Sequence, residues 1–95
     1  RILRLIHQKN ISTLAVLDEG QVEILEFKVD KPTGLTGKCL RDIAGRFPKG
    51  ALVATIIRGE EVMVPSGDSR IEVGDSVVMV AALDSIDAVL KLFTS

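Results

Sequence analysis

Few side chains in this sequence have the chemistry to make or break bonds. The single histidine, His7, has no acid or nucleophile beside it in the sequence, and we interpret it as a surface or interface residue. The single cysteine, Cys39, is interpreted as a small, partly buried residue rather than a nucleophile. Glu60 and Glu61 are adjacent, so on a strand they would point to opposite faces and could not form an acid/base pair. The sequence therefore predicts no catalytic residues and no enzyme.

Metal and phosphate motifs are equally sparse. One histidine and one cysteine are too few ligands for a structural zinc site, and the aspartates lack the spacing of an EF-hand loop. The stretch GLTGK at residues 34–38 resembles a Walker phosphate loop only superficially, because its glycines are too close together and Cys39 replaces the magnesium-binding hydroxyl. Free N–H groups near Lys38 could hold an anion weakly, although plain helix capping is the simpler interpretation. We expect no metal site.

Length, composition and charge describe one small domain. The 95 residues have a mass of 10.2 kDa, are 46% hydrophobic and 26% charged, and carry a formal net charge of −1. Aromatic residues make up only 3%, so base-stacking platforms for single-stranded nucleic acid are not expected. Residues 28–49 hold six bases and two acids, whereas residues 50–95 hold three bases and seven acids. This asymmetry could favour association between copies or attract a small anion, although an ordinary solvated surface is the simpler interpretation. DNA binding would need a stronger basic excess.

The first part of the chain predicts a helix end and a hairpin. Residues 1–9 have the apolar pattern of the end of an amphipathic helix, and their abrupt start indicates a piece of something longer. Residues 12–17 and 21–29 are apolar-rich stretches separated by the turn sequence DEG, which predicts a β-hairpin. Thr36 is then placed to cap a helix that continues to about Arg46. The apolar stripe of that helix consists of Leu40, Ile43, Ala44 and Phe47.

The second part of the chain predicts short strands and a final helix. Residues 51–58 form a continuous apolar, largely β-branched run, typical of a strand covered on both faces. Further strands are predicted at residues 61–65, 71–73 and 76–82. Asp84 or Ser85 is expected to cap a last helix, whose apolar stripe consists of Ile86, Val89, Leu90 and Phe93. Because tight turns pair neighbouring strands antiparallel, the predicted fold is α+β, a small mostly antiparallel sheet with helices packed on it.

In their order along the chain, these segments resemble the TrkA-C (RCK-C) domain family. The resemblance is carried by EILEFKV at 23–29, GLTGKCLRDI at 34–43, ALVATIIR at 51–58, Val64-Pro65 and IEVGDSVVMV at 71–80. It implies that residues 21–95 are a TrkA-C-like regulatory domain. It also implies that residues 1–20 are the tail of a crossover from an upstream nucleotide-binding subdomain.

The resemblance implies a dimeric, ligand-sensing domain of a cytosolic subunit that gates a Trk- or Ktr-type potassium transport system. In some similar proteins a small ligand such as a cyclic dinucleotide lies in a groove between two copies, and the ligand varies among members. NAD or ATP would bind only in an upstream domain. The groove residues that it implies are Ile56, Ile57, Arg58 and Pro65, with the loop through Arg70 adjacent. Two isoleucines and a proline offer an apolar shelf for a planar base, and Arg58 offers a planar fork for phosphate. Two alternatives stay open: the isoleucines as core or dimer packing, and Arg58 as a strand-ending surface residue.

The expected partners are a second copy of the chain, a membrane potassium transporter subunit and a small-molecule ligand, with no nucleic acid. No apolar run of about 18 residues and no signal peptide is visible. The expected location is therefore the cytoplasm, peripheral to the inner face of the cell membrane through a partner. The alternative function is a purely structural dimerisation domain of a cation transporter or antiporter, with no small-molecule ligand.

Overall fold

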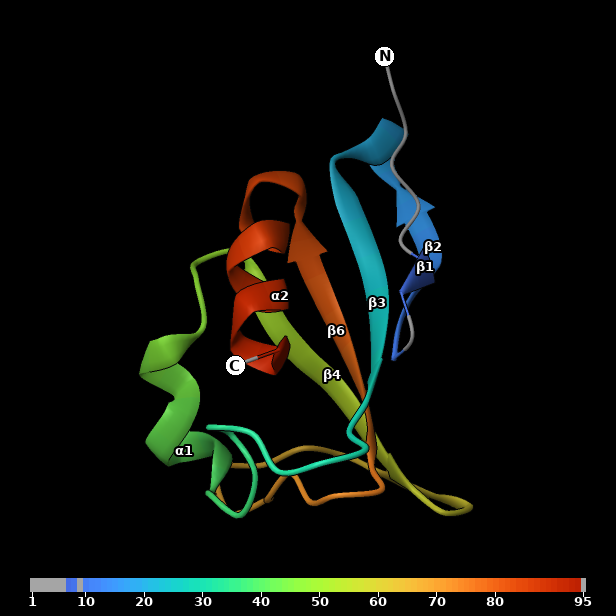
Figure 1. Ribbon diagram of the computed structural model, residues 1–95. Coiled ribbons are helices and arrows are strands. Elements are labelled where there is room, and N and C mark those ends of the chain that lie inside the picture. The colour runs from blue at the N-terminus through green and yellow to red at the C-terminus, as the bar shows by residue number, and fades with distance from the viewer. Residues whose placement is uncertain (1–6, 9, 95) are drawn as a thin grey trace.

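Tight turns and two-residue alternation give this chain an antiparallel sheet. The computed structural model describes residues 7–8 and 10–94. Its sheet has six strands in the order β1-β2-β3-β6-β4-β5, and every neighbouring pair is antiparallel (Figure 1). The predicted α+β class is confirmed. The strands are β1 (His7–Gln8), β2 (Ile11–Leu17), β3 (Val22–Lys28), β4 (Ala51–Arg58), β5 (Glu61–Met63) and β6 (Ser76–Ala82).

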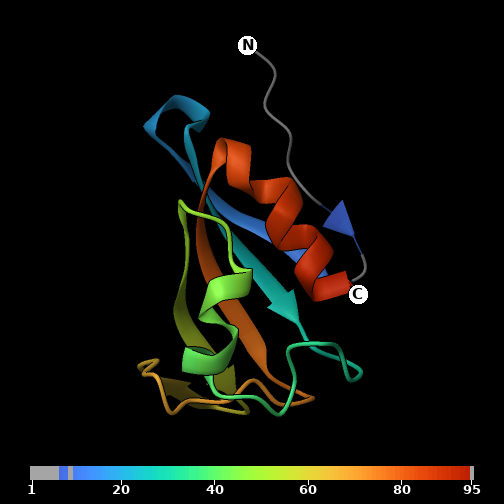
Figure 2. The ribbon, with the colours of Figure 1, turned by 90° about the vertical axis from the view of Figure 1, so that its left-hand side faces the viewer.

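Two α-helices lie on the same face of the sheet (Figures 1 and 2). The first, α1 (Leu40–Ile43), is a single turn that runs into the 3₁₀ helix η2 (Ala44–Arg46). The second, α2 (Ile86–Thr94), follows the 3₁₀ helix η3 (Leu83–Ser85). Within residues 7–8 and 10–94, neither helix is long and apolar enough to cross a membrane.

The core lies between this sheet face and the helices. The stripe predicted for the last helix is confirmed, because Ile86, Val89 and Phe93 of α2 are buried. Phe93 stacks on Phe27 of β3, with ring centroids 4.2 Å apart and ring planes 13° from parallel. The other fully buried large side chains come from the strands, from α1 and from two loops: Leu25, Leu35, Ile43, Ile56, Ile71, Val77 and Met79.

The predicted hairpin is confirmed, but the predicted helix before it is wrong where the structure describes it. β2 and β3 pair through η1 (Asp18–Gly20), which forms the turn. His7 and Gln8 form β1, which pairs with the edge of β2, because an unpaired strand edge offers its hydrogen-bonding groups to any adjacent segment. Residues 1–6 and 9 lie outside the described residues. The hairpin crosses the predicted boundary at residue 20, and the assignment of residues 1–20 to a crossover stays a prediction.

The middle helix is shorter than predicted. It begins at Leu40 rather than after Thr36, and its N-cap residue, Cys39, makes no side-chain capping hydrogen bond. The Thr36 hydroxyl is used inside the preceding loop instead, where it accepts from the Thr33 N–H at 3.1 Å and donates to the Thr33 carbonyl at 3.0 Å. Gly37 then has a φ of +77°, which is incompatible with a helix.

Three further expectations need correction. β4 is not covered on both faces, because Leu52 is 58% exposed on the side facing away from the helices. Residues 71–73 form no full strand: Ile71 makes only an isolated bridge to Thr36. Ser85 lies in η3, where its hydroxyl donates to the Lys49 carbonyl at 2.5 Å and so ties the end of β6 to the segment before β4.

Candidate functional site

A groove lies along the free edge of β4, between that strand and α1. β5 pairs with β4 only at residues 56–58, so in the described part of the chain residues 51–53 have no neighbouring strand on that side. The groove holds about 420 Å³ and is open to solvent along one side. Its lining comes from the α1 region, from the start of β4 and from the loop after β5: Leu40, Arg41, Ala44, Phe47, Ala51, Leu52, Val53, Pro65, Ser66 and Gly67.

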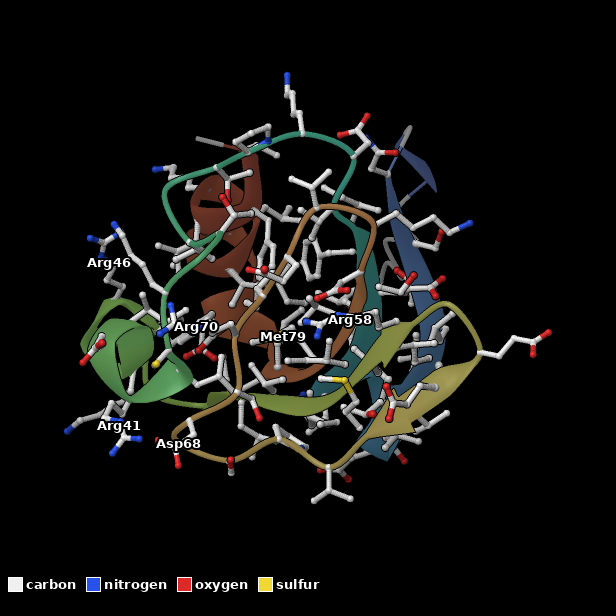
Figure 3. All side chains as sticks on the ribbon, turned by 90° about the horizontal axis from the view of Figure 1, so that it is seen from below. Arg41, Arg46, Arg58, Asp68, Arg70 and Met79 are labelled. Atoms are coloured by element: carbon white, nitrogen blue, oxygen red, sulfur yellow. The ribbon has the colours of Figure 1, made fainter. Side chains whose placement is uncertain are left out.

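The groove has an apolar floor and one positive charge at its rim. Leu40, Phe47 and Val53 also pack against the core, which holds the floor in place. The guanidinium of Arg41 forms an ion pair with the carboxylate of Asp68 (Figure 3). Both side chains are mostly exposed, so this pair is weakly held and another anion can replace the carboxylate.

The loop at residues 64–75 forms the third wall of the groove and also caps α1. The N–H of Leu40 donates to the Ser69 carbonyl at 2.8 Å, and the N–H of Arg41 donates to the Gly67 carbonyl at 3.1 Å. These loop carbonyls satisfy the first N–H groups of α1, which a capping side chain would otherwise serve. Loop and helix are therefore one hydrogen-bonded unit.

An ion pair between Arg58 and the buried Asp75 anchors the same loop to the end of β4. The Nε and Nη2 atoms of Arg58 each donate to a different carboxylate oxygen of Asp75 at 2.9 Å, and Nη2 also donates to the Arg70 carbonyl at 3.0 Å. Figure 3 shows Arg58 inside the curve of the loop, with Arg70 on the side toward α1. Asp75 is only 1% exposed, and it accepts a further bond from the Glu72 N–H at 2.8 Å.

The electrostatics of this pair follow from its geometry. Burial by itself raises the pKa of Asp75, but the hydrogen bonds from Arg58 and Glu72, together with the charge of Arg58, outweigh burial and leave the pKa below its ordinary value. The hydrogen bond to Asp75 raises the pKa of Arg58, which stays charged. Both groups are therefore ionised at neutral pH.

The structure separates the four residues predicted to contact a ligand. Pro65 lines the groove. Ile56 is fully buried in the core, and Ile57 is half-buried on the opposite sheet face, where it pairs with Val62 and Ser76. The guanidinium of Arg58 is occupied by Asp75. A ligand contact by any of the four stays a prediction.

Sequence reasoning missed most of the groove. Leu40, Ala44 and Phe47 were interpreted only as the core stripe of a longer helix, and Leu52 as part of a strand covered on both faces. The charge excess of residues 28–49 was the available signal, since Arg41 belongs to that segment. A sequence does not show that β5 pairs with only three residues of β4, at positions 56–58.

The other candidates for chemistry lie on different elements where the structure describes them. Cys39 is half-buried at the start of α1, and the side chain of His7 lies outside what the structure describes. Glu60 is in the turn before β5, whereas Glu61 is on that strand. Among the residues that the structure describes, no group of histidine, cysteine and acidic side chains could hold a metal ion.

Comparison with known proteins identifies a matching domain family and similar proteins. Residues 24–94 match the family model of the TrkA-C domain. The chain is similar to the Trk system potassium uptake protein TrkA homolog 1 of Methanosarcina mazei, with 33% identity over 92 residues that cover 97% of this chain and 20% of that protein. The chain thus spans about a fifth of the length of the curated relatives that it matches.

Solved structures show the same fold. The RCK domain of GsuK superposes with a TM-score of 0.74 at 16% identity, covering 90% of this chain and 18% of that one. The RCK_C domain dimer of S. agalactiae BusR in complex with c-di-AMP gives a TM-score of 0.66 at 24% identity, covering 79% of this chain and 94% of that one. BusR has also been solved with promoter DNA, as a longer chain of which this chain covers 42%.

Proposed function

Since this chain belongs to the TrkA-C domain family, we propose that it is the ligand-sensing regulatory domain of a cytosolic subunit that gates a Trk- or Ktr-type potassium transporter. Its ligand is a cyclic dinucleotide held between two copies of the chain. The observation that carries this proposal is the groove beside α1, with its apolar floor and cationic rim. The relatives named for potassium uptake and the BusR dimer with c-di-AMP support the choice of process and ligand.

The groove offers the chemistry that a cyclic dinucleotide needs. Phe47, Val53 and Pro65 present apolar surface to a planar base. The guanidinium of Arg41 provides a planar, charged fork for phosphate once Asp68 is displaced. Its volume of about 420 Å³ lies toward the lower end of the range of about 300–1,000 Å³ typical of small-molecule sites.

A second copy completes the site. One groove is open along one side, so a ligand with two bases and two phosphates would stay half in solvent on a single chain. A twofold arrangement presents the same groove twice and matches the symmetry of a cyclic dinucleotide. Leu52, which is 58% exposed beside the groove, is then covered by the ligand or by the partner copy.

The mechanism is conformational coupling. A ligand that binds only one dimer geometry stabilises that geometry by RT ln(1 + [L]/Kd), about 2.7 kcal/mol at a hundredfold excess over Kd. The bias passes to the transporter through residues 1–20, the proposed crossover, whose strand β2 belongs to the same sheet as β4. The domain works in the cytoplasm at the inner face of the membrane through that partner, without catalysis and without binding nucleic acid.

A substitution inside the groove and a matched one outside it test this proposal. Leu52→Ser removes an exposed apolar side chain at the edge of the groove, whereas Val62→Ser removes one that is 68% exposed on β5 and does not line the groove. We expect c-di-AMP to raise the melting temperature of the wild type and of Val62→Ser, with a smaller shift for Leu52→Ser. No shift for the wild type would reject the ligand and favour a purely structural dimerisation domain.

A further inference from the structure

The groove has two walls that do not belong to the sheet, and both depend on one loop. Pro65, Ser66 and Gly67 form one wall directly. The other wall is α1, whose first N–H groups are bonded to the carbonyls of Gly67 and Ser69. Gly37, which precedes the helix, is hydrogen-bonded to the same loop through both of its backbone groups. Its N–H donates to the Ile71 carbonyl at 2.8 Å, and its carbonyl accepts from Nη1 of Arg70 at 2.6 Å.

α1 cannot hold this position by itself. It has four residues, too few for a helix to be stable without tertiary contacts. It has no capping side chain, so the loop carbonyls take the place of a cap. Ile43 anchors the last residue of α1 in the core, whereas the loop carbonyls hold the first residues, so the position of the loop decides where α1 begins.

The buried side chain of Ile71 anchors the middle of the loop in the core, and hydrogen bonds hold its far end to the sheet. Arg58 reaches from the end of β4 to Asp75 and to the Arg70 carbonyl. Asp75 in turn accepts from Glu72 through its side chain and from the Val29 N–H through its carbonyl, the latter at 2.8 Å. A single guanidinium thus joins β4 to the segment that caps α1.

We propose that Arg58 is a positioning residue for the groove: by holding residues 70–75 against β4 it keeps residues 65–69 in place, and these fix α1. Arg58 acts through Asp75 and the loop, and it does not touch the ligand. This inference rests on the proposed function only in its consequence for ligand affinity. The claim that Arg58 fixes the position of the loop and of α1 concerns the protein without ligand, and it can be tested without any ligand.

Arg58→Lys tests the inference most directly. Lysine keeps the charge beside Asp75 but lacks the fork that holds two carboxylate oxygens and the Arg70 carbonyl at once. The readout is amide hydrogen exchange at Leu40 and Arg41, whose N–H groups donate to the loop. The control is Ile86→Val or Val89→Ala, whichever has a melting temperature closer to that of Arg58→Lys, because both residues are buried in α2 and do not line the groove.

We expect exchange at Leu40 and Arg41 to rise at least about tenfold in Arg58→Lys relative to the stability-matched control, with the amides of β3 and β6 unchanged. Equal exchange in both variants would show that Arg58 contributes only to global stability and would overturn the inference. If Arg58→Lys does not fold, Asp75→Asn is measured in the same way with the same expectation.

Titration with c-di-AMP separates this inference from the proposed function. We expect the affinity of Arg58→Lys to fall about tenfold below that of the matched control, since binding must then also pay for ordering α1. Faster exchange at Leu40 with no binding by the wild type would support the positioning role and reject the proposed ligand. Unchanged affinity together with faster exchange would reject the link between loop position and ligand binding.

Discussion

The two forked donors of Arg58 meet the two carboxylate oxygens of Asp75, each at 2.9 Å. Burial is unequal across this pair: the Asp75 side chain is 1% exposed, whereas the Arg58 side chain is 43% exposed. Removing the guanidinium leaves a buried anion with only the Glu72 N–H for compensation, whereas removing the negative charge leaves a cation that water can solvate. Removing the guanidinium of Arg58 should therefore destabilise the fold more than removing the negative charge of Asp75.

Arg58→Ala is expected to lower the free energy of unfolding by about 2 kcal/mol. This is less than the cost of about 3–5 kcal/mol for breaking a fully buried pair, because solvent already screens the exposed guanidinium. Asp75→Asn is expected to cost about half as much. Urea denaturation measures both, with Arg46→Ala as a control, since the Arg46 guanidinium donates to the Gly34 carbonyl at the surface and pairs with no carboxylate among the described residues. Equal losses for Arg58→Ala and Arg46→Ala would contradict the ion-pair account.

Acid should remove the contribution of Asp75. Because its pKa is lowered in the folded state, the unfolded chain takes up the proton first, so this part of the stability is complete above the unfolded value of about 3.9 and is lost as the pH falls toward the folded value. The difference in unfolding free energy between the wild type and Asp75→Asn should therefore shrink from about pH 7 to about pH 3. Urea denaturation at both values checks this, and a difference that stays constant or grows in acid would show that the pKa is not lowered.

Much of the sheet could be predicted from the sequence because its signals are local. β6 was predicted with its observed limits, and the hairpin of β2 and β3 is marked by alternating residues on either side of a tight turn. The middle helix was predicted too long because Thr36 is a good capping residue, and its hydroxyl instead closes a loop turn. Loop carbonyls that cap α1 come from about thirty residues further along the chain, and no local pattern reveals them.

Gly50 and Gly59 differ in how much a substitution by alanine should destabilise the fold. Both have positive φ, +86° and +63°. A Cβ on Gly50 would lie 3.1 Å from the Ala82 Cβ and 3.1 Å from the Ser85 Oγ, whereas a Cβ on Gly59 would meet nothing within 4 Å. Gly59→Ala should cost about 1 kcal/mol from the left-handed conformation alone, and Gly50→Ala should cost more because the end of β6 must also move. Thermal unfolding ranks the two, and a larger loss at Gly59 would contradict this packing.

Ile56 tests whether the isoleucine pair is core. Its side chain is fully buried beside Val77, so Ile56→Val should lower the free energy of unfolding by about 0.5–1.5 kcal/mol through the lost methylene. The affinity for c-di-AMP should not change, because Ile56 does not line the groove. Calorimetric titration measures the affinity. A large loss of affinity for c-di-AMP with little loss of stability would show that Ile56 contacts the ligand.

The candidate site was only partly predictable for a physical reason. Pro65 was identified because a family resemblance pointed to it, and it does line the groove. Arg58 has the right chemistry to bind phosphate, but in the structure its guanidinium binds Asp75, 17 residues further along the chain. Asp75 is buried and needs a positive partner, and the sequence does not reveal this burial. The exposure of Leu52 cannot be predicted from the apolar run in which it lies. It depends on β5 pairing with β4 only at residues 56–58.

The stoichiometry of c-di-AMP binding to this chain tests the central claim, that two copies share one ligand. Isothermal titration calorimetry gives the number of ligands per chain, and sedimentation velocity of the same sample gives the mass of the complex. We predict one ligand for every two chains, with the complex sedimenting as a dimer. One ligand per chain on a monomer, or no binding heat at saturating ligand, would contradict it.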